Sequence, residues 1–151
     1  MTLLGLDPGL SATGYGVIID NSKFFSGTIR PKEKVYIQKI LTICKAIEKL
    51  IHLYKPDAVA IEKAFYKKNV ASLVRISELR GAILYLLLQK RITILEYTPA
   101  QVKLTTTGNG QASKKQVRFI IERILIKNKS RLSHHAIDAL AIAYTASRKI
   151  G

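Results

Sequence analysis

The sequence predicts a single α/β domain, spanning residues 1–151, in which helices flank a five-stranded mixed sheet. Two observations predict this class. Short apolar runs of strand length alternate with longer segments in which apolar residues recur every three or four positions, the spacing of amphipathic helices. The first three runs are separated only by turns and so form antiparallel strands, whereas helix-length segments separate the last two, as parallel strands require.

The three opening strands are predicted at residues 2–7, 14–20 and 23–30. Pro8-Gly9 ends the first strand, and Asn21-Ser22 turns the second into the third. Consecutive strands joined by such short connections form an antiparallel meander. The chain therefore opens with three neighbouring strands.

The central part of the chain alternates helix and strand. Residues 33–54 are predicted as an amphipathic helix that Pro56 stops, and residues 57–62 as a buried strand of a parallel sheet. A second helix is expected over 70–89 and a fifth strand over 92–97. The apolar stripe of the first helix consists of Ile37, Ile40, Leu41, Cys44, Ile47, Ile51 and Tyr54.

Three further helices are predicted to complete the chain. Pro99 lies in the first turn of a short helix, where its missing N–H costs little. Residues 113–116 match a capping box that begins a helix over 114–127, and Ser133 can cap the last helix, 134–148. The residues of the helix 114–127 that are expected to face inward are Val117, Ile120, Ile121 and Ile124.

The later half of the second helix, residues 79–88, is apolar nearly all round. A helix without a polar face is buried on two sides, once against its own sheet and once against another surface. That second surface is either a homodimer interface or the interior of the domain, and the sequence does not separate the two.

This order of elements is that of the ribonuclease-H-like arrangement, in which the first and fourth strands lie side by side at the centre. Asp7 ends the first strand and Glu62 ends the fourth, so the carboxylates meet at one edge if these strands run in the same direction. Asp138 lies within the apolar stretch of the last helix, where a charge needs a compensating partner.

These three carboxylates predict a metal site. Mg²⁺ prefers carboxylate oxygens, and two divalent ions can activate a water and stabilise the leaving oxygen of a phosphodiester. His135 lies three residues before Asp138 on the same helical face, where it can bind the second metal or act as a base. Three of these residues also have a structural interpretation: Asp7 as a turn residue, Glu62 as a cap of the following loop and His135 as a cap of its helix.

The net charge of +15 is concentrated after residue 62, which favours a nucleic acid as partner over charge for solubility or an anionic membrane. Aromatic and basic side chains follow Glu62 directly, and further cations flank the glycine-containing loop before residue 114; Phe65 could instead fold back on the core. The predicted DNA-binding residues are Phe65, Tyr66, Lys67, Lys68, Lys103, Lys114, Lys115 and Arg118.

No apolar run approaches the ~20 residues of a membrane span, and no signal peptide precedes the first strand. We therefore expect a cytoplasmic protein that does not associate with membranes. The single cysteine, Cys44, excludes an internal disulfide and a thiolate zinc cluster.

Five motifs in order resemble the RuvC family of Holliday-junction resolvases, from about residue 3 to 146. They are Gly-Leu-Asp-Pro-Gly (5–9), Thr-Gly-Tyr-Gly-Val (13–17), Ala-Ile-Glu-Lys-Ala-Phe (60–65), Ala-Gln-Val-Lys (100–103) and Asp-Ala-Leu-Ala-Ile-Ala (138–143). The resemblance implies Asp7, Glu62 and Asp138 as metal ligands. It also implies that Phe65 inserts against bases near the crossover and that Lys103 and Lys114 make contacts near the scissile phosphate. Many members of the family carry an acid where this chain has His135, although histidine also occurs there.

The function expected is that of a metal-dependent endodeoxyribonuclease with two Mg²⁺ or Mn²⁺ ions per site. It would resolve four-way junctions in recombination and repair by symmetric nicking of opposing strands. The partners expected are branched DNA, a second copy of the chain bound through the helix 70–89, and a branch-migration helicase complex. Two alternatives are a ribonuclease-H-like nuclease acting on other branched DNA or on RNA, and a non-catalytic binder of branched DNA.

Overall fold

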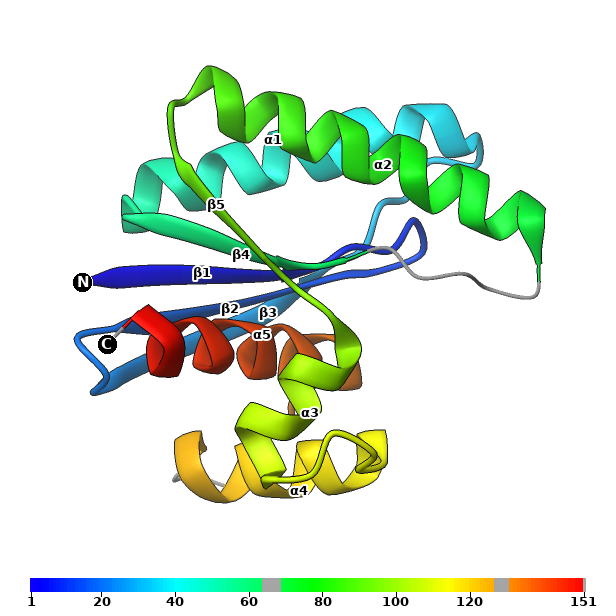
Figure 1. The fold of residues 1–151 in the computed structure, drawn as a ribbon. Coiled ribbons are helices and arrows are strands. Elements are labelled where there is room, and N and C mark those ends of the chain that lie inside the picture. The colour runs from blue at the N-terminus through cyan, green and yellow to red at the C-terminus, as the bar shows by residue number, and fades with distance from the viewer. Residues whose placement is uncertain (64–68, 127–130, 151) are drawn as a thin grey trace.

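A computed structural model describes residues 1–63, 69–126 and 131–150 of the chain (Figure 1). One mixed sheet has the strand order β3-β2-β1-β4-β5. The first three strands pair antiparallel, and β4 and β5 continue the sheet parallel to β1. The strands are β1 (Thr2–Asp7), β2 (Thr13–Ile19), β3 (Lys23–Ile29), β4 (Ala58–Glu62) and β5 (Thr93–Tyr97). The predicted ribonuclease-H-like sheet, three antiparallel strands followed by two parallel ones, is confirmed.

Helices cover both faces of this sheet (Figure 1). On one face lie α1 (Tyr36–Tyr54) and α2 (Val70–Gln89). On the other face lies α5 (His134–Ile150), with α3 (Pro99–Thr107) and α4 (Lys114–Leu125) packed against it. The predicted capping box of α4 is present, with the side chain of Ser113 accepting from the N–H of Gln116 and that of Gln116 accepting from the N–H of Ser113.

The two faces of the sheet belong to separate hydrophobic cores, because successive side chains of a strand point to opposite sides. Leu4 and Leu6 of β1 pack with α1 and α2, whereas Leu3 packs with α5. In β4, Ala58 and Ala60 lie on the α5 side. The same alternation places Asp7 and Glu62, the last residues of these strands, on the α5 side.

Glycines bring α5 unusually close to the sheet. A Cβ atom built on Gly14 of β2 would lie 1.9 Å from the carbonyl oxygen of His135, and one on Gly5 would lie 2.3 Å from that of Ala139. The backbone of α5 therefore rests against the backbone of β1 and β2, with no room for a side chain between them. This contact places the first turns of α5 beside the end of β1.

The predicted inward faces of two helices were partly wrong. In α1, Ile37 and Leu41 are exposed and Ile43 is fully buried, because the helix contacts the sheet along one stripe and leaves its additional apolar residues outside. In α4, Leu125 is buried where Ile124 had been expected, since Ile124 lies on the outer side of the last turn.

The outer face of α2 is apolar and uncovered by the described part of the chain. Leu79, Ile83, Leu86 and Leu87 are buried, whereas Tyr85 and Leu88 are 65% and 66% exposed. The alternative in which this helix is buried on both sides within its own domain is therefore contradicted. None of the helices that the structure describes is long and apolar enough to cross a membrane.

Candidate active site

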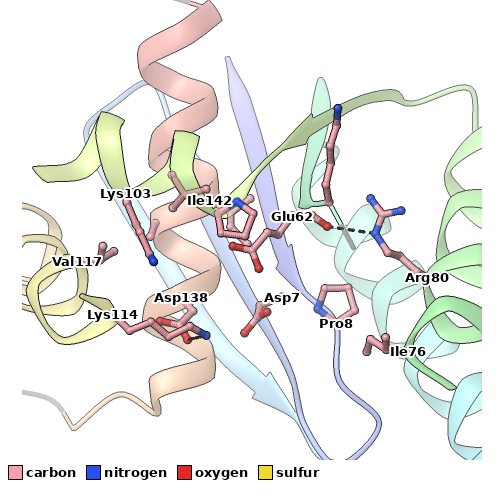
Figure 2. A pocket seen from close by; sticks show the side chains of 14 residues that line it. Asp7, Pro8, Glu62, Ile76, Arg80, Lys103, Lys114, Val117, Asp138 and Ile142 are labelled. Atoms are coloured by element: carbon pink, nitrogen blue, oxygen red, sulfur yellow. Dashed lines mark hydrogen bonds and ion pairs between the residues drawn. The ribbon is translucent and has the colours of Figure 1, made fainter. Parts of the chain in front are cut away.

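A pocket of about 280 Å³ opens at the edge of the sheet where β1 and β4 end, with α3, α4 and α5 on one side of it and α2 on the other (Figure 2). Carboxylates from three elements line it: Asp7 from β1, Glu62 from β4 and Asp138 from α5. Two of the predicted DNA-binding cations, Lys103 of α3 and Lys114 of α4, line the same pocket. Folding therefore brings together residues that are up to 131 positions apart in the sequence.

The strands fix the relative positions of the first two acids. Leu6 of β1 pairs with Ile61 of β4, so the next residues along these parallel strands, Asp7 and Glu62, end the sheet side by side. Beyond β1, the hydroxyl of Thr13 donates to the carbonyl of Gly9 at 2.8 Å and accepts from its N–H at 3.2 Å. These bonds close the turn that follows Asp7.

Arg80 of α2 holds the end of β4 and was not among the predicted site residues. Its Nε donates to the backbone carbonyl of Glu62 at 3.1 Å (Figure 2). Its Nη2 donates to the carboxylate of Glu96. The Arg80 side chain is only 13% exposed and lines the pocket. The signal in the sequence was an arginine at the start of the apolar half of α2, between Leu79 and the run that follows Gly81, which is a position where a charge needs anionic partners.

Asp138 is bound by a cation of the protein itself. Nε of Arg118 donates to Oδ1 at 3.0 Å and Nη2 donates to Oδ2 at 2.9 Å, a two-point pair in which both side chains are largely buried. Nζ of Lys114 lies 3.9 Å from the same Oδ2. Hydrogen bonding to Asp138 raises the pKa of Arg118 above its ordinary value. The compensating partner that an aspartate in an apolar helix requires is thus found on α4.

His135 lies next to Asp7, and its Nδ1 is 4.0 Å from Oδ2 of the carboxylate, which is too long for a hydrogen bond. About half of the His135 side chain is exposed. Among the described residues, no three histidine, cysteine, aspartate or glutamate side chains are arranged to hold a metal ion. The acids thus share a pocket, while both oxygens of Asp138 face Arg118.

The structure does not place the other predicted DNA-binding residues on the pocket. Lys115 is exposed and lies outside the pocket, and the guanidinium of Arg118 is engaged with Asp138. Residues 65–68, which hold Phe65, Tyr66, Lys67 and Lys68, fall outside the described residues. A cation that was not predicted, Lys63, directly follows Glu62 and lines the pocket.

Comparisons with known proteins show the family to which the chain belongs. A family model described as crossover junction endodeoxyribonuclease RuvC matches residues 3–146. A protein of that name from Petrotoga mobilis is 39% identical, covering 95% of this chain and 91% of its own. One from Aliarcobacter butzleri is 35% identical, covering 99% of this chain and 100% of its own.

Solved structures show the same relationship. RuvC of T. thermophilus in complex with a Holliday junction substrate matches with a TM-score of 0.88 at 26% identity, over 99% of this chain and 94% of its own. The yeast mitochondrial Holliday junction resolvase Ydc2 matches with a TM-score of 0.68 at 16% identity, over 97% of this chain and 77% of its own, and so shares the fold. The family match and the full-length relatives show that the chain belongs to the RuvC family of crossover junction endodeoxyribonucleases.

Proposed function

We propose that the protein resolves four-way DNA junctions by metal-dependent hydrolysis of one phosphodiester in each of two opposing strands. The observation that carries this proposal is the single pocket in which Asp7, Glu62 and Asp138 lie beside Lys103 and Lys114. Carboxylates that hold cations and ammonium groups that meet phosphates are both needed to cut a polyanion. Membership of the RuvC family and the likeness to a relative bound to a Holliday junction support the substrate.

The donor set fits Mg²⁺ or Mn²⁺, because these ions prefer oxygen ligands and the pocket offers carboxylates from three elements. Asp7, Glu62 and Asp138 would hold the ions, with His135 as an additional ligand or base beside Asp7. Two such ions would polarise the phosphate, lower the pKa of the attacking water and stabilise the leaving oxygen.

The other residues of the pocket would bind and orient the substrate. Lys103 and Lys114 lie on the rim opposite β4 and can neutralise the phosphate at the cut site (Figure 2). Arg80 acts on Glu62 through the backbone, since it bonds the carbonyl and so fixes the strand end that carries the carboxylate. Phe65 and Tyr66 would stack on unpaired bases near the crossover.

A substrate panel tests the proposal. We expect Mg²⁺-dependent nicks at symmetric positions in two opposing strands of a four-way junction, with slower cutting of forks and flaps and none of linear duplex. Preferential cutting of an RNA–DNA hybrid would favour the alternative ribonuclease-H-like activity. Tight junction binding without any cutting in Mg²⁺ or Mn²⁺ would favour the other alternative, a non-catalytic binder of branched DNA.

We further propose that two copies of the chain associate through α2, because two strands must be cut. Tyr85 and Leu88 form an exposed apolar stripe with Val74, which is 50% exposed. Gly81 lies on the same face, and a Cβ built there would meet no atom within 4 Å, so another helix can approach closely at this point. A branch-migration helicase complex stays a prediction as a further partner.

Replacing both Tyr85 and Leu88 by glutamate is expected to convert a dimer into a monomer, because the facing stripes would bring four carboxylates together without cations. Sedimentation equilibrium measures the mass. Leu104→Glu is the matched control, since Leu104 is 54% exposed on α3, away from α2. If the double variant sediments like the wild type, or if the wild type is itself monomeric at micromolar concentration, α2 is not the interface.

A further inference from the structure

The ion pair between Arg118 and Asp138 is the feature of the site that the proposed function does not use. The guanidinium donates to both carboxylate oxygens, at 3.0 and 2.9 Å, and the two side chains are 23% and 16% exposed. A two-point pair between arginine and carboxylate is the strongest form of charged hydrogen bond, and partial burial protects it from screening by salt. Such a pair is not an incidental surface contact.

The same carboxylate oxygens are the ones that a divalent cation requires. While Arg118 holds both of them, it occupies one lone pair of each oxygen and fixes the orientation of the carboxylate, and its positive charge opposes a cation at the lone pairs that remain. This agrees with the arrangement of the described residues, in which three carboxylates line one pocket without forming a ready set of three ligands. A guanidinium left within a few ångströms of a divalent ion would also repel it.

We propose that Arg118 competes with the divalent cation for Asp138, so that the cation binds only when the guanidinium gives up the carboxylate. This inference rests on the proposed function, because it needs Asp138 as a ligand of the cation. In the metal-free protein Arg118 compensates a buried negative charge that would otherwise destabilise α5. The pair thus stabilises the metal-free site at the expense of affinity for the metal.

The position of Arg118 allows this exchange. The arginine reaches Asp138 from α4 and does not itself line the pocket, so it can withdraw without crossing the space that the cation and the phosphate would fill. Lys114, one turn earlier on α4, lies 3.9 Å from the carboxylate but is 69% exposed. The lysine is therefore the weaker competitor, and it remains available to a phosphate.

The test is the affinity of the DNA-free protein for Mn²⁺, measured by the electron paramagnetic resonance of the unbound ion. Arg118→Gln is expected to bind Mn²⁺ about tenfold more tightly than the wild type, which corresponds to about 1.4 kcal/mol. The Mn²⁺ affinity of Arg118→Lys is expected to lie between those of the wild type and Arg118→Gln, because an ammonium group cannot bond both carboxylate oxygens as the forked guanidinium does. Arg123→Gln is the matched control, since it removes the same charge from the same helix at a residue that stacks on Phe119 instead.

Thermal unfolding gives a second measurement. Without metal, Arg118→Gln is expected to unfold at a lower temperature than the wild type. Saturating Mn²⁺ is expected to raise the unfolding midpoint of the variant by more than it raises that of the wild type, because tighter binding to the folded state stabilises it further. Circular dichroism at low temperature shows whether the variant is folded.

Asp138→Asn separates this inference from the function on which it rests. We expect it to weaken Mn²⁺ binding and to abolish the gain from Arg118→Gln in the double variant. An affinity unchanged in folded Arg118→Gln, or raised equally in Arg123→Gln, overturns the competition; if Asp138→Asn still weakens binding, the metal site itself stands. If Asp138→Asn binds Mn²⁺ as the wild type does, Asp138 is not a ligand, and the assignment of the metal site fails together with the inference.

Discussion

Asp7→Asn is expected to lower the rate of junction cutting at least about 100-fold while junction binding is kept. Substituting a residue that hydrogen-bonds to a metal ligand typically lowers metal affinity or activity 10- to 100-fold, and substituting the ligand itself should lower activity by more. Asparagine has almost the same size as aspartate, so the end of β1 and its pairing with β4 should not change. Binding should persist because it comes from cations such as Lys103 and Lys114 that meet phosphates.

Cleavage assays in Mg²⁺ and gel-shift assays in its absence measure the two effects separately. Asp20→Asn is the matched control, because Asp20 is an exposed carboxylate near the opposite end of β1, where it pairs with the N-terminus. If Asp7→Asn loses junction binding together with cutting, the division between acids that cut and lysines that bind is wrong. If it cuts as the wild type does, Asp7 is not part of the catalytic centre.

The second large effect is expected at a residue that carries no functional group. Gly14→Ala places a methyl group 1.9 Å from the carbonyl oxygen of His135, which is backbone and cannot rotate away. Either α5 or β2 must shift, and overpacking of this kind typically costs about 3 kcal/mol or less, more where backbone has to move. For a chain of this length, 3 kcal/mol lowers the unfolding midpoint by roughly 6–12 °C.

The shift would also separate His135 and Asp138 from Asp7, so cutting is expected to fall more than tenfold even at temperatures where the variant is folded. Calorimetry and cleavage at low temperature measure the two effects. Gly110→Ala is the control, since the nearest atom to a Cβ there lies at an ordinary 3.6 Å. If Gly14→Ala is as stable and as active as Gly110→Ala, the close contact does not position the site.

The sequence was sufficient to predict the order and direction of the strands, because apolar runs, turns and helix-length spacers each depend on neighbouring residues. It also placed Asp7 and Glu62 at strand ends, and strand alternation then gives them a common face without further information. The cap at Ser113 was predicted for the same reason, since it is a local motif over four residues.

What the sequence did not reveal depends on contacts between distant elements. Nothing near Arg118 indicates that it bonds Asp138, because the pairing follows from how α4 crosses α5. Arg80 supports Glu62 through a backbone carbonyl, a role that no sequence motif encodes. The exposed side chains of Ile37 and Leu41 show the same limit. The spacing of apolar residues identifies the apolar face of a helix, but it does not tell how much of that face the neighbouring elements cover.

The division of the interior into two cores has a practical consequence for protein engineering. The core between the sheet and α1 and α2 includes Ile43, Ile47 and Leu79, none of which reaches the pocket. Substitutions at these three positions that improve packing can raise thermal tolerance, while the catalytic spacing stays fixed by the backbone contact on the far side of the sheet and by the bond from Arg80 to the carbonyl of Glu62. This protein can therefore be stabilised on one side with little of the usual loss of activity.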